Sequence, residues 1–218
     1  MIKEINKKTN MQEFIIIAIA LLVSLTFHEA AHAGMAYLLG DNTAKSQGRL
    51  SLNPIRHLDP LGTLVFAVTR MIGWGKPVPV NSQNFKNPIR DNALVALAGP
   101  FSNFIISIAI LIPLKYLPRT TPEFVALTLL YIFHISIFLG IFNLLPFPPL
   151  DGSKVLGLVI PRKFYRQYIN FLQNGAKYSI AIFLFDALIL SRILHYSLLT
   201  IVLSHLHDMT SWILNLST

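Results

Sequence analysis

Long runs without a charged residue constrain this chain more than any other feature of its sequence. Two such runs, residues 92–114 and 124–150, contain 23 and 27 residues and no Asp, Glu, Lys or Arg. A helix of about 20 apolar residues crosses the roughly 30 Å hydrocarbon layer of a bilayer. The two runs therefore predict two transmembrane helices, because backbone polar groups inside lipid must be hydrogen-bonded within the protein.

The composition agrees with a membrane protein and excludes several other classes. Apolar residues make up 53% of the 218 residues and charged residues only 13%, against about 45–50% and 25% in soluble domains. The chain has no cysteine, which excludes disulfide scaffolds and thiolate metal sites. Its net charge of +8 comes from basic residues scattered between the apolar runs, so we do not expect nucleic acid as a partner.

Residues 14–40 form a third apolar run, which three ionisable side chains interrupt. Glu29 is the only acidic residue of this run, and the run also holds His28 and His32. Ionisable groups inside a membrane helix are costly and are functional by default. The sequence thus predicts a membrane all-α fold, a polytopic helical bundle with three core transmembrane helices and a functional site in the first of them.

The C-terminal part of the chain is apolar but less clearly transmembrane. Residues 178–191 and 193–216 carry ionisable groups, so spanning and interfacial helices both remain open there. We expect residues 1–160 to form the core and residues 161–218 to form a C-terminal helical segment, while the oligomeric state stays open. The ionisable groups concerned are Asp186, His195, His205, His207 and Asp208.

The loop between the first and second runs, about residues 41–91, is rich in glycine, proline and asparagine. Alternation of apolar and other residues at 49–53 and 78–81 is typical of short edge strands, which predicts a small β-containing insertion after the first core helix. The apolar stretch 61–74 is too short to span, but it could dip into the membrane where protein covers its backbone.

Basic residues favour one side of the membrane for this loop. If two crossings separate them, loop 41–91 and the segment after the third run lie on one side and hold twelve basic residues, against five on the other. Cytoplasmic segments carry the excess of Lys and Arg, which predicts a cytoplasmic loop, although the basic N-terminus favours the opposite orientation. The twelve are Lys45, Arg49, Arg56, Arg70, Lys76, Lys86, Arg90, Lys154, Arg162, Lys163, Arg166 and Lys177, and the five are Lys3, Lys7, Lys8, Lys115 and Arg119.

Residues 28–32 read His-Glu-Ala-Ala-His, an H-E-x-x-H pattern within a helical run. Side chains four residues apart share one helix face, so His28 and His32 can bind the same metal ion. Two neutral imidazoles and a carboxylate suit Zn²⁺ and leave its fourth position for a water whose pKa falls to about 7. Glu29 would be the general base for that water. The alternative is two histidines that merely hydrogen-bond inside a helix bundle.

Asp151 is the strongest candidate for a third metal ligand. It follows Asn143-Leu-Leu-Pro-Phe-Pro-Pro-Leu, whose three prolines prevent a regular helix. Broken backbone at membrane depth must border protein or a cavity, which favours a position of Asp151 near the first helix. Alternatively, Asp151 only caps the N-terminus of a helix that starts near Ser153.

Together these residues resemble the site-2 protease family of intramembrane zinc metalloproteases. The family combines H-E-x-x-H in one transmembrane helix with N-x-x-P-x-x-P-x-D-G in another, and the second pattern matches residues 143–152. Three further blocks, at 48–63, 76–81 and 98–103, occur in the family order. The resemblance covers about residues 14–160 and implies a minimal form without a PDZ or CBS domain.

The resemblance implies that His28, His32 and Asp151 are the zinc ligands. Glu29 would then activate the water that attacks a peptide carbonyl. Asn143 and Asn103 would hold the substrate or the developing oxyanion, because an amide can donate that hydrogen bond without adding a charge. The implied activity is hydrolysis of membrane-spanning or membrane-inserted polypeptides in the lipid bilayer of a prokaryotic cell. A catalytically silent membrane scaffold that binds transmembrane clients is the alternative.

Other ionisable residues are weaker candidates for a functional site. His57 and Asp59 lie in a turn-rich loop, where such residues more often build hydrogen bonds than bind metal. His134 lies within the third run, where polar packing between helices is the simpler interpretation. His195, His205 and His207 fit a wet helix face better than a metal site, and Asp186 either pairs with Arg192 or marks a water path.

Overall fold

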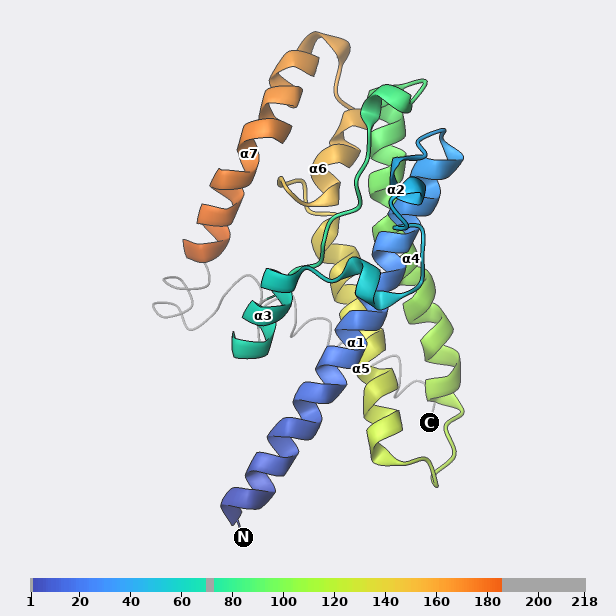
Figure 1. Ribbon diagram of the computed structural model, residues 1–218, viewed down its shortest axis with the longest axis vertical. Helices are drawn as coiled ribbons and strands as arrows, with labels where there is room; N and C mark the ends of the chain where they lie inside the picture. The colour runs from blue at the N-terminus through green and yellow to red at the C-terminus, as the bar shows by residue number, and fades with distance from the viewer. Residues whose placement is uncertain (1, 70–72, 186–218) are drawn as a thin grey trace.

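In the computed structural model the described residues, 2–69 and 73–185, form helices joined by turns and short extended segments (Figure 1). The core helices are α1 (Ile2–Leu38), α4 (Pro88–Lys115) and α5 (Glu123–Asn143). The other α-helices are α2 (Thr43–Ser46), α3 (Pro60–Thr69), α6 (Asp151–Val155) and α7 (Tyr165–Phe185). Short 3₁₀ helices lie at Pro54–His57, Ser82–Asn84, Leu156–Leu158 and Arg162–Phe164.

The three core helices are long and apolar enough to cross a bilayer. The candidate spans are Met11–Leu38, Pro88–Lys115 and Glu123–Asn143, of 28, 28 and 21 residues. On α4 the side chains of Ile105, Ile108 and Ile112 share one face and are more than half exposed, as expected of a helix face that contacts lipid. The prediction of an all-α membrane fold with three core transmembrane helices is confirmed.

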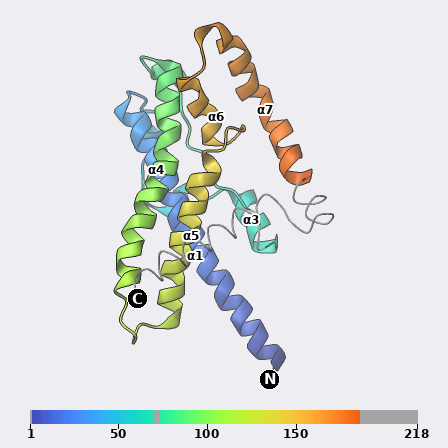
Figure 2. The same cartoon turned by 180° about the vertical axis from the view of Figure 1, so that it is seen from behind.

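Helices α1, α4 and α5 pack against one another, with α4 antiparallel to α1 and α5 returning beside them (Figures 1 and 2). Small residues let these helices approach closely. A Cβ atom at Gly140 of α5 would lie 2.7 Å from the ring of Phe104 on α4. Ser24 of α1 and Ser136 of α5 are fully buried, and their hydroxyl oxygens are 2.8 Å apart. A polar pair in the interface therefore fixes how α1 and α5 pack.

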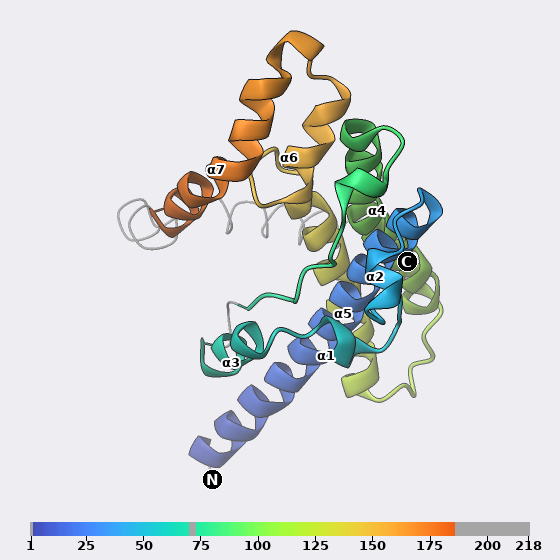
Figure 3. The same cartoon turned by 45° about the horizontal axis from the view of Figure 1, so that its top comes forward.

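The third core helix stops at Asn143, well before the uncharged run ends. Prolines at 146, 148 and 149 remove backbone donors and prevent helix in the following turn, so the predicted interruption is confirmed. The chain re-enters helix at α6, which lies between α7 and α4 (Figure 3). Gly152 permits this sharp re-entry, because a Cβ atom there would lie only 2.1 Å from the carbonyl oxygen of Leu144.

The predicted β-containing insertion is wrong for the described part of the loop, where the backbone pairing is one isolated bridge between Leu58 and Gly75. At 49–53 the side chain of Asn53 accepts a hydrogen bond from the backbone N–H of Ile55 at 3.1 Å and starts a 3₁₀ helix. Residues 78–81 are extended, but their backbone bonds to side chains instead of a neighbouring strand. Alternation alone therefore did not distinguish a strand from an extended segment held by side chains.

Residues 76–81, which we name the clamped segment, are held at one end by Arg49. The buried guanidinium of Arg49 donates hydrogen bonds to the carbonyl oxygens of Lys76 and Pro77, the second at 3.2 Å. Burial lowers the pKa of Arg49, and the nearby negative charge of Glu29 opposes that shift. Arg49 is therefore a buried cation that fixes backbone rather than an exposed loop charge.

Asp41 holds the other end of the clamped segment. Its carboxylate accepts hydrogen bonds from the backbone N–H of Asn81 and from the side-chain amide of Asn84, both at 2.7 Å. Burial raises the pKa of Asp41, but hydrogen bonds from Thr43, Asn81 and Asn84 outweigh it and hold the pKa below its usual range. The end of α1 and the clamped segment are thus joined through an ionised carboxylate.

Two peripheral helices complete the described residues. Helix α3, of 10 residues, takes up much of the apolar stretch 61–74 and is too short to span a bilayer. Helix α7 is joined to α6 because the hydroxyl of Tyr168 lies 3.1 Å and 2.9 Å from the carbonyl oxygens of Ser153 and Lys154. The predictions for Asp186, His195, His205, His207 and Asp208, and for a crossing at 193–216, concern positions outside the described residues.

Candidate metal centre

The two histidines of the H-E-x-x-H pattern lie on one buried face of α1. His28 and His32 are one helical turn apart and are 4% and 8% exposed, so both rings are sequestered from solvent. Their Nε2 atoms are 3.0 Å apart. The sequence spacing therefore does bring two imidazole nitrogens to a common point.

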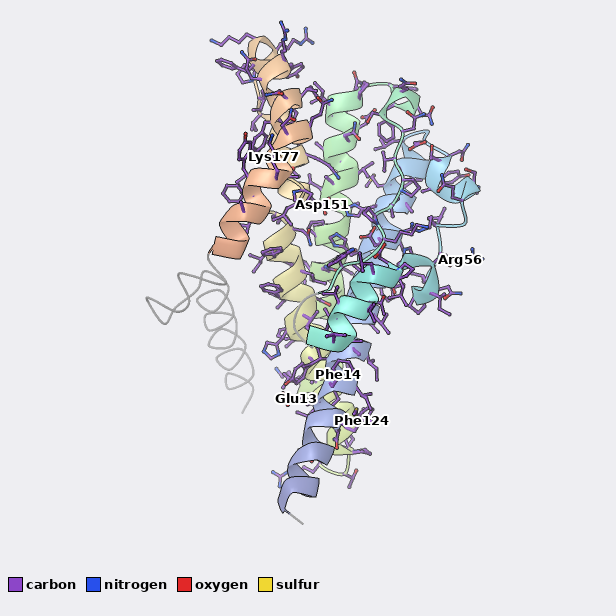
Figure 4. The ribbon with its side chains drawn as sticks, turned by 60° about the vertical axis from the view of Figure 1, so that its left-hand side comes forward. Glu13, Phe14, Arg56, Phe124, Asp151 and Lys177 are labelled. Carbon is purple, nitrogen blue, oxygen red and sulfur yellow. The ribbon has the colours of Figure 1, made fainter. Side chains whose placement is uncertain are left out.

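Asp151, the first residue of α6, reaches the same point from a distant part of the chain. Its Oδ2 atom lies 3.2 Å from Nε2 of His28 and 3.1 Å from Nε2 of His32. The residue that precedes the helix, at the N-cap, is Leu150, and the buried carboxylate faces the two rings instead of capping α6. Figure 4 places Asp151 in the half of the molecule away from Phe14 and Phe124.

The three converging atoms fit a zinc ion. A tetrahedral Zn²⁺ with ligand bonds of about 2.0–2.1 Å separates neighbouring donor atoms by about 3.3 Å, and the three observed separations are 3.0, 3.1 and 3.2 Å. The three residues form a buried group of metal-ligand side chains. Two imidazoles and one carboxylate are a zinc donor set with a position left open.

Helix α4 supplies the groups that contact the outer edges of both rings. Nδ1 of His32 lies 2.7 Å from the backbone carbonyl oxygen of Val95, which can only accept a hydrogen bond. That Nδ1 therefore carries the proton, and in the neutral ring Nε2 keeps its lone pair. The side-chain amide of Asn103 lies 3.2 Å from Nδ1 of His28. His28 and His32 thus both contact α4.

Gly99 lies between these two contacts, four residues from each along α4. A Cβ atom at Gly99 would lie 2.4 Å from Nε2 of His32 and 2.7 Å from Cε1 of His28. Only glycine leaves room for both rings and for an ion between them. The helix–helix approach at this glycine is therefore part of the metal centre.

Glu29 lies on α1 beside the ligands and is half-buried. One of its carboxylate oxygens, Oε2, accepts a hydrogen bond from the backbone N–H of Val78 in the clamped segment at 3.1 Å. The clamped segment, fixed by Arg49 and Asp41, therefore contacts the residue predicted to be the general base. Sequence reasoning missed this role of Val78, because it treated residues 78–81 as a strand.

A match to the family model of Peptidase family M50 covers residues 120–187. The chain is also 44% identical over 152 residues to a Bacillus subtilis protein named "Putative zinc metalloprotease YwhC", covering 66% of this chain and 69% of that protein. The chain belongs to peptidase family M50. This M50 peptidase is a zinc metalloprotease with membrane-spanning helices, and the predicted resemblance to the site-2 protease family is confirmed.

More distant relatives carry names of the same kind. A Mycobacterium tuberculosis protein named "Putative zinc metalloprotease Rip2" is 30% identical over 148 residues, which are 66% of this M50 peptidase but 56% of that protein. "Putative zinc metalloprotease MJ0611" of Methanocaldococcus jannaschii is 37% identical over 67 residues, 30% of this chain and 34% of its own length. No solved structure shows a significant match.

The remaining predicted residues of the M50 peptidase lie in different surroundings. Asn143, at the end of α5, is half-buried and donates a hydrogen bond to the carbonyl oxygen of Leu139 at 3.0 Å, within its own helix. Nε2 of the buried His57 lies 2.7 Å from the carbonyl oxygen of Ser51. Asp59 accepts a hydrogen bond from the backbone N–H of Gly62 at 2.8 Å, so these two loop residues build turns.

Two residues of the metal centre, Gly99 and Val95, were not predicted as site residues from the sequence. Gly99 carries a signal, because small residues in membrane helices permit close packing, but nothing in the sequence links it to the histidines. Val95 could not have been found, because its contribution is a backbone carbonyl that every residue possesses.

Proposed function

We propose that this M50 peptidase cleaves membrane-spanning polypeptides within the bilayer. The observation that carries the proposal is the buried group of His28, His32 and Asp151, two of whose members lie on a candidate membrane span. In a helix the peptide groups are engaged in internal hydrogen bonds, which must open before a peptide carbonyl can be attacked. A substrate must therefore be locally extended where it meets this group. A zinc protease that acts on soluble substrates would have no need to carry two ligands on an apolar helix long enough to cross a bilayer.

In the proposed site, His28, His32 and Asp151 hold the zinc ion. When bound, zinc lowers the pKa of a coordinated water and stabilises negative charge on an oxygen. Glu29 acts as the general base through Oε1, since Oε2 is engaged with the N–H of Val78. This hydrogen bond orients the Glu29 carboxylate, and a general base held in position transfers a proton more efficiently.

Asn143 is the proposed donor to the substrate carbonyl. It precedes the proline-rich turn that leads to Asp151, and among the described residues its amide bonds to the carbonyl oxygen of Leu139 in its own helix. That intrahelical bond can be exchanged for a bond to substrate at little cost, because the carbonyl of Leu139 can still accept from its own helix. We further propose that loop 41–91 lies on the cytoplasmic side and that residues 161–218 form a separate C-terminal segment of the unit.

The test is cleavage of a single-span substrate in lipid vesicles by the wild type and by Asp151→Ala, with the products mapped by mass spectrometry. We expect cuts within the spanning segment by the wild type and none by the variant. Cuts confined to the flanking soluble residues would contradict an intramembrane site. Binding of the substrate without any cut by a zinc-loaded wild type would favour the catalytically silent scaffold instead.

A further inference from the structure

Asn103 is the most deeply buried polar side chain around the ligand histidines. Its exposed fraction is 0%, it lies on α4 one turn beyond Gly99, and its amide nitrogen is 3.2 Å from Nδ1 of His28. Its amide oxygen has no hydrogen-bond partner within the described residues. A buried amide oxygen without a partner destabilises the fold, so the orientation of this amide needs a physical explanation.

The chemistry of His28 decides that orientation. For Nε2 of His28 to bind a metal it must keep its lone pair, so Nδ1 of the neutral ring must carry the proton. A protonated Nδ1 needs an acceptor, and an NH₂ group is not one. The oxygen and nitrogen of an asparagine amide are assigned from the hydrogen-bond network, because their positions are nearly interchangeable. An amide turned by 180° about its last bond meets the requirement.

We propose that Asn103 is a positioning residue of the metal centre, with its amide oxygen accepting a hydrogen bond from Nδ1–H of His28. In this orientation the amide fixes the tautomer and the ring plane of His28 and leaves Nε2 free for zinc. As placed in the structure, the amide oxygen has no hydrogen-bond partner among the described residues, so the contact with His28 decides between the two orientations. This assignment differs from the oxyanion role that the family resemblance implies for Asn103.

The neighbouring ligand gives independent support for this assignment. Nδ1 of His32 meets a pure acceptor, the carbonyl oxygen of Val95, at 2.7 Å. Val95 and Asn103 lie eight residues apart on one face of α4, which is antiparallel to α1. Val95 therefore faces His32, and Asn103 faces His28. With the amide turned, both ligand rings donate to α4 through Nδ1 and present Nε2 to the same point. Outer hydrogen bonds of this kind typically change metal affinity by about 10–100-fold.

The inference rests on the ligand set of the proposed function, and zinc affinity tests it separately from proteolysis. The experiment measures zinc affinity of the detergent-purified full chain by competition with a chelator, for the wild type, Asn103→Leu, Asn103→Asp, Ser107→Ala and His28→Ala. Leu matches the size of Asn without an acceptor, whereas Asp keeps an acceptor oxygen. Ser107 is the matched control, because it is a buried polar residue one turn further along α4 that bonds to the carbonyl of Phe104.

We expect Asn103→Leu to bind zinc about 10–100-fold more weakly than the wild type, and Asn103→Asp and Ser107→Ala to stay close to the wild type. Unchanged zinc affinity in Asn103→Leu would overturn the assignment. If turnover also fell in that variant, Asn103 would be assigned to substrate binding instead. Equal losses of zinc affinity in Asn103→Leu and Ser107→Ala would show that the effect comes from the packing of α4 and not from the contact with His28. Should Asn103→Leu fail to fold, Asn103→Asp decides, because loss of zinc from that variant contradicts the acceptor role. Wild-type affinity in His28→Ala would refute the ligand set instead.

Discussion

Nδ1 of His32 lies 2.7 Å from the backbone carbonyl oxygen of Val95, which places the second histidine of the proposed zinc site in direct contact with the second core helix. No substitution of Val95 removes that carbonyl oxygen. The contact instead depends on how closely α1 and α4 approach. We therefore expect the proposed zinc site to be sensitive to the residue that sets this approach, Gly99.

Gly99→Ala is expected to weaken zinc binding by at least about tenfold. The new Cβ atom would lie 2.4 Å from Nε2 of His32, so the rings must move or α4 must retreat. Alanine favours helix over glycine by about 1 kcal/mol, so any loss cannot come from helix propensity. The measurement is zinc per chain after dialysis against a weak chelator.

Gly34→Ala is the matched control for that substitution. Gly34 also lies in a core helix, but a Cβ atom there would meet Leu50 at an ordinary 3.8 Å. We expect normal zinc content in this variant. Equal zinc in Gly99→Ala and Gly34→Ala would show that the rings do not need the space at Gly99.

Arg49→Lys is expected to lower proteolysis about tenfold while zinc content stays normal. A lysine cannot reproduce the planar fork of donors that binds two carbonyl oxygens, here those of Lys76 and Pro77. The clamped segment would loosen, and the hydrogen bond from Val78 to Glu29 with it. Arg56→Lys, in the exposed part of the same loop, is the control, and a loss as large in this variant would exclude a specific role of the clamp.

Asp41→Asn is expected to lower the stability of the chain by about 1–2 kcal/mol at neutral pH. Because hydrogen bonds hold the folded-state pKa of Asp41 below its usual value, its contribution is complete above about pH 4 and is lost as the pH falls through the folded-state pKa. The stability difference between the wild type and Asp41→Asn should therefore shrink in acid. Thermal unfolding in detergent at several pH values measures it, and a difference that grows in acid would contradict the sign.

The sequence predicted the parts of this protein that depend on hydrophobicity and local spacing. Apolar length alone located the three core helices, and a spacing of four placed His28 and His32 on one face. The prolines after Asn143 correctly predicted that the helix breaks. Asp151 could be named as a candidate ligand because it follows that break, where the chain must meet other protein, and it does lie within 3.2 Å of both histidines.

Contacts between distant segments could not be predicted from the sequence. Residues 78–81 alternate as a strand does, yet the side chains of Glu29 and Asp41 bind the backbone N–H groups of Val78 and Asn81 in place of a partner strand. Local alternation cannot reveal a clamp made by side chains that lie tens of residues away. Asn103 was found through the family resemblance, but its contact with His28 depends on the pairing of α1 with α4.

Ser24→Ala and Ser136→Ala are expected to be coupled by about 1 kcal/mol in a double-mutant cycle. Their hydroxyl oxygens are 2.8 Å apart in a buried interface between α1 and α5, so either single substitution removes the same hydrogen bond. Unfolding by a denaturing detergent in mixed micelles gives the four free energies. Strictly additive effects would mean that this pair does not hold the two helices together.

The central claim is that zinc held by His28, His32 and Asp151 works with Glu29 as the base. Zinc content and cleavage of a single-span substrate, measured together for the wild type and Glu29→Gln, test it most directly. We predict about one zinc per chain in both proteins and cleavage by the wild type alone. Cleavage by Glu29→Gln at the wild-type rate, or a folded wild type without zinc, would contradict the account.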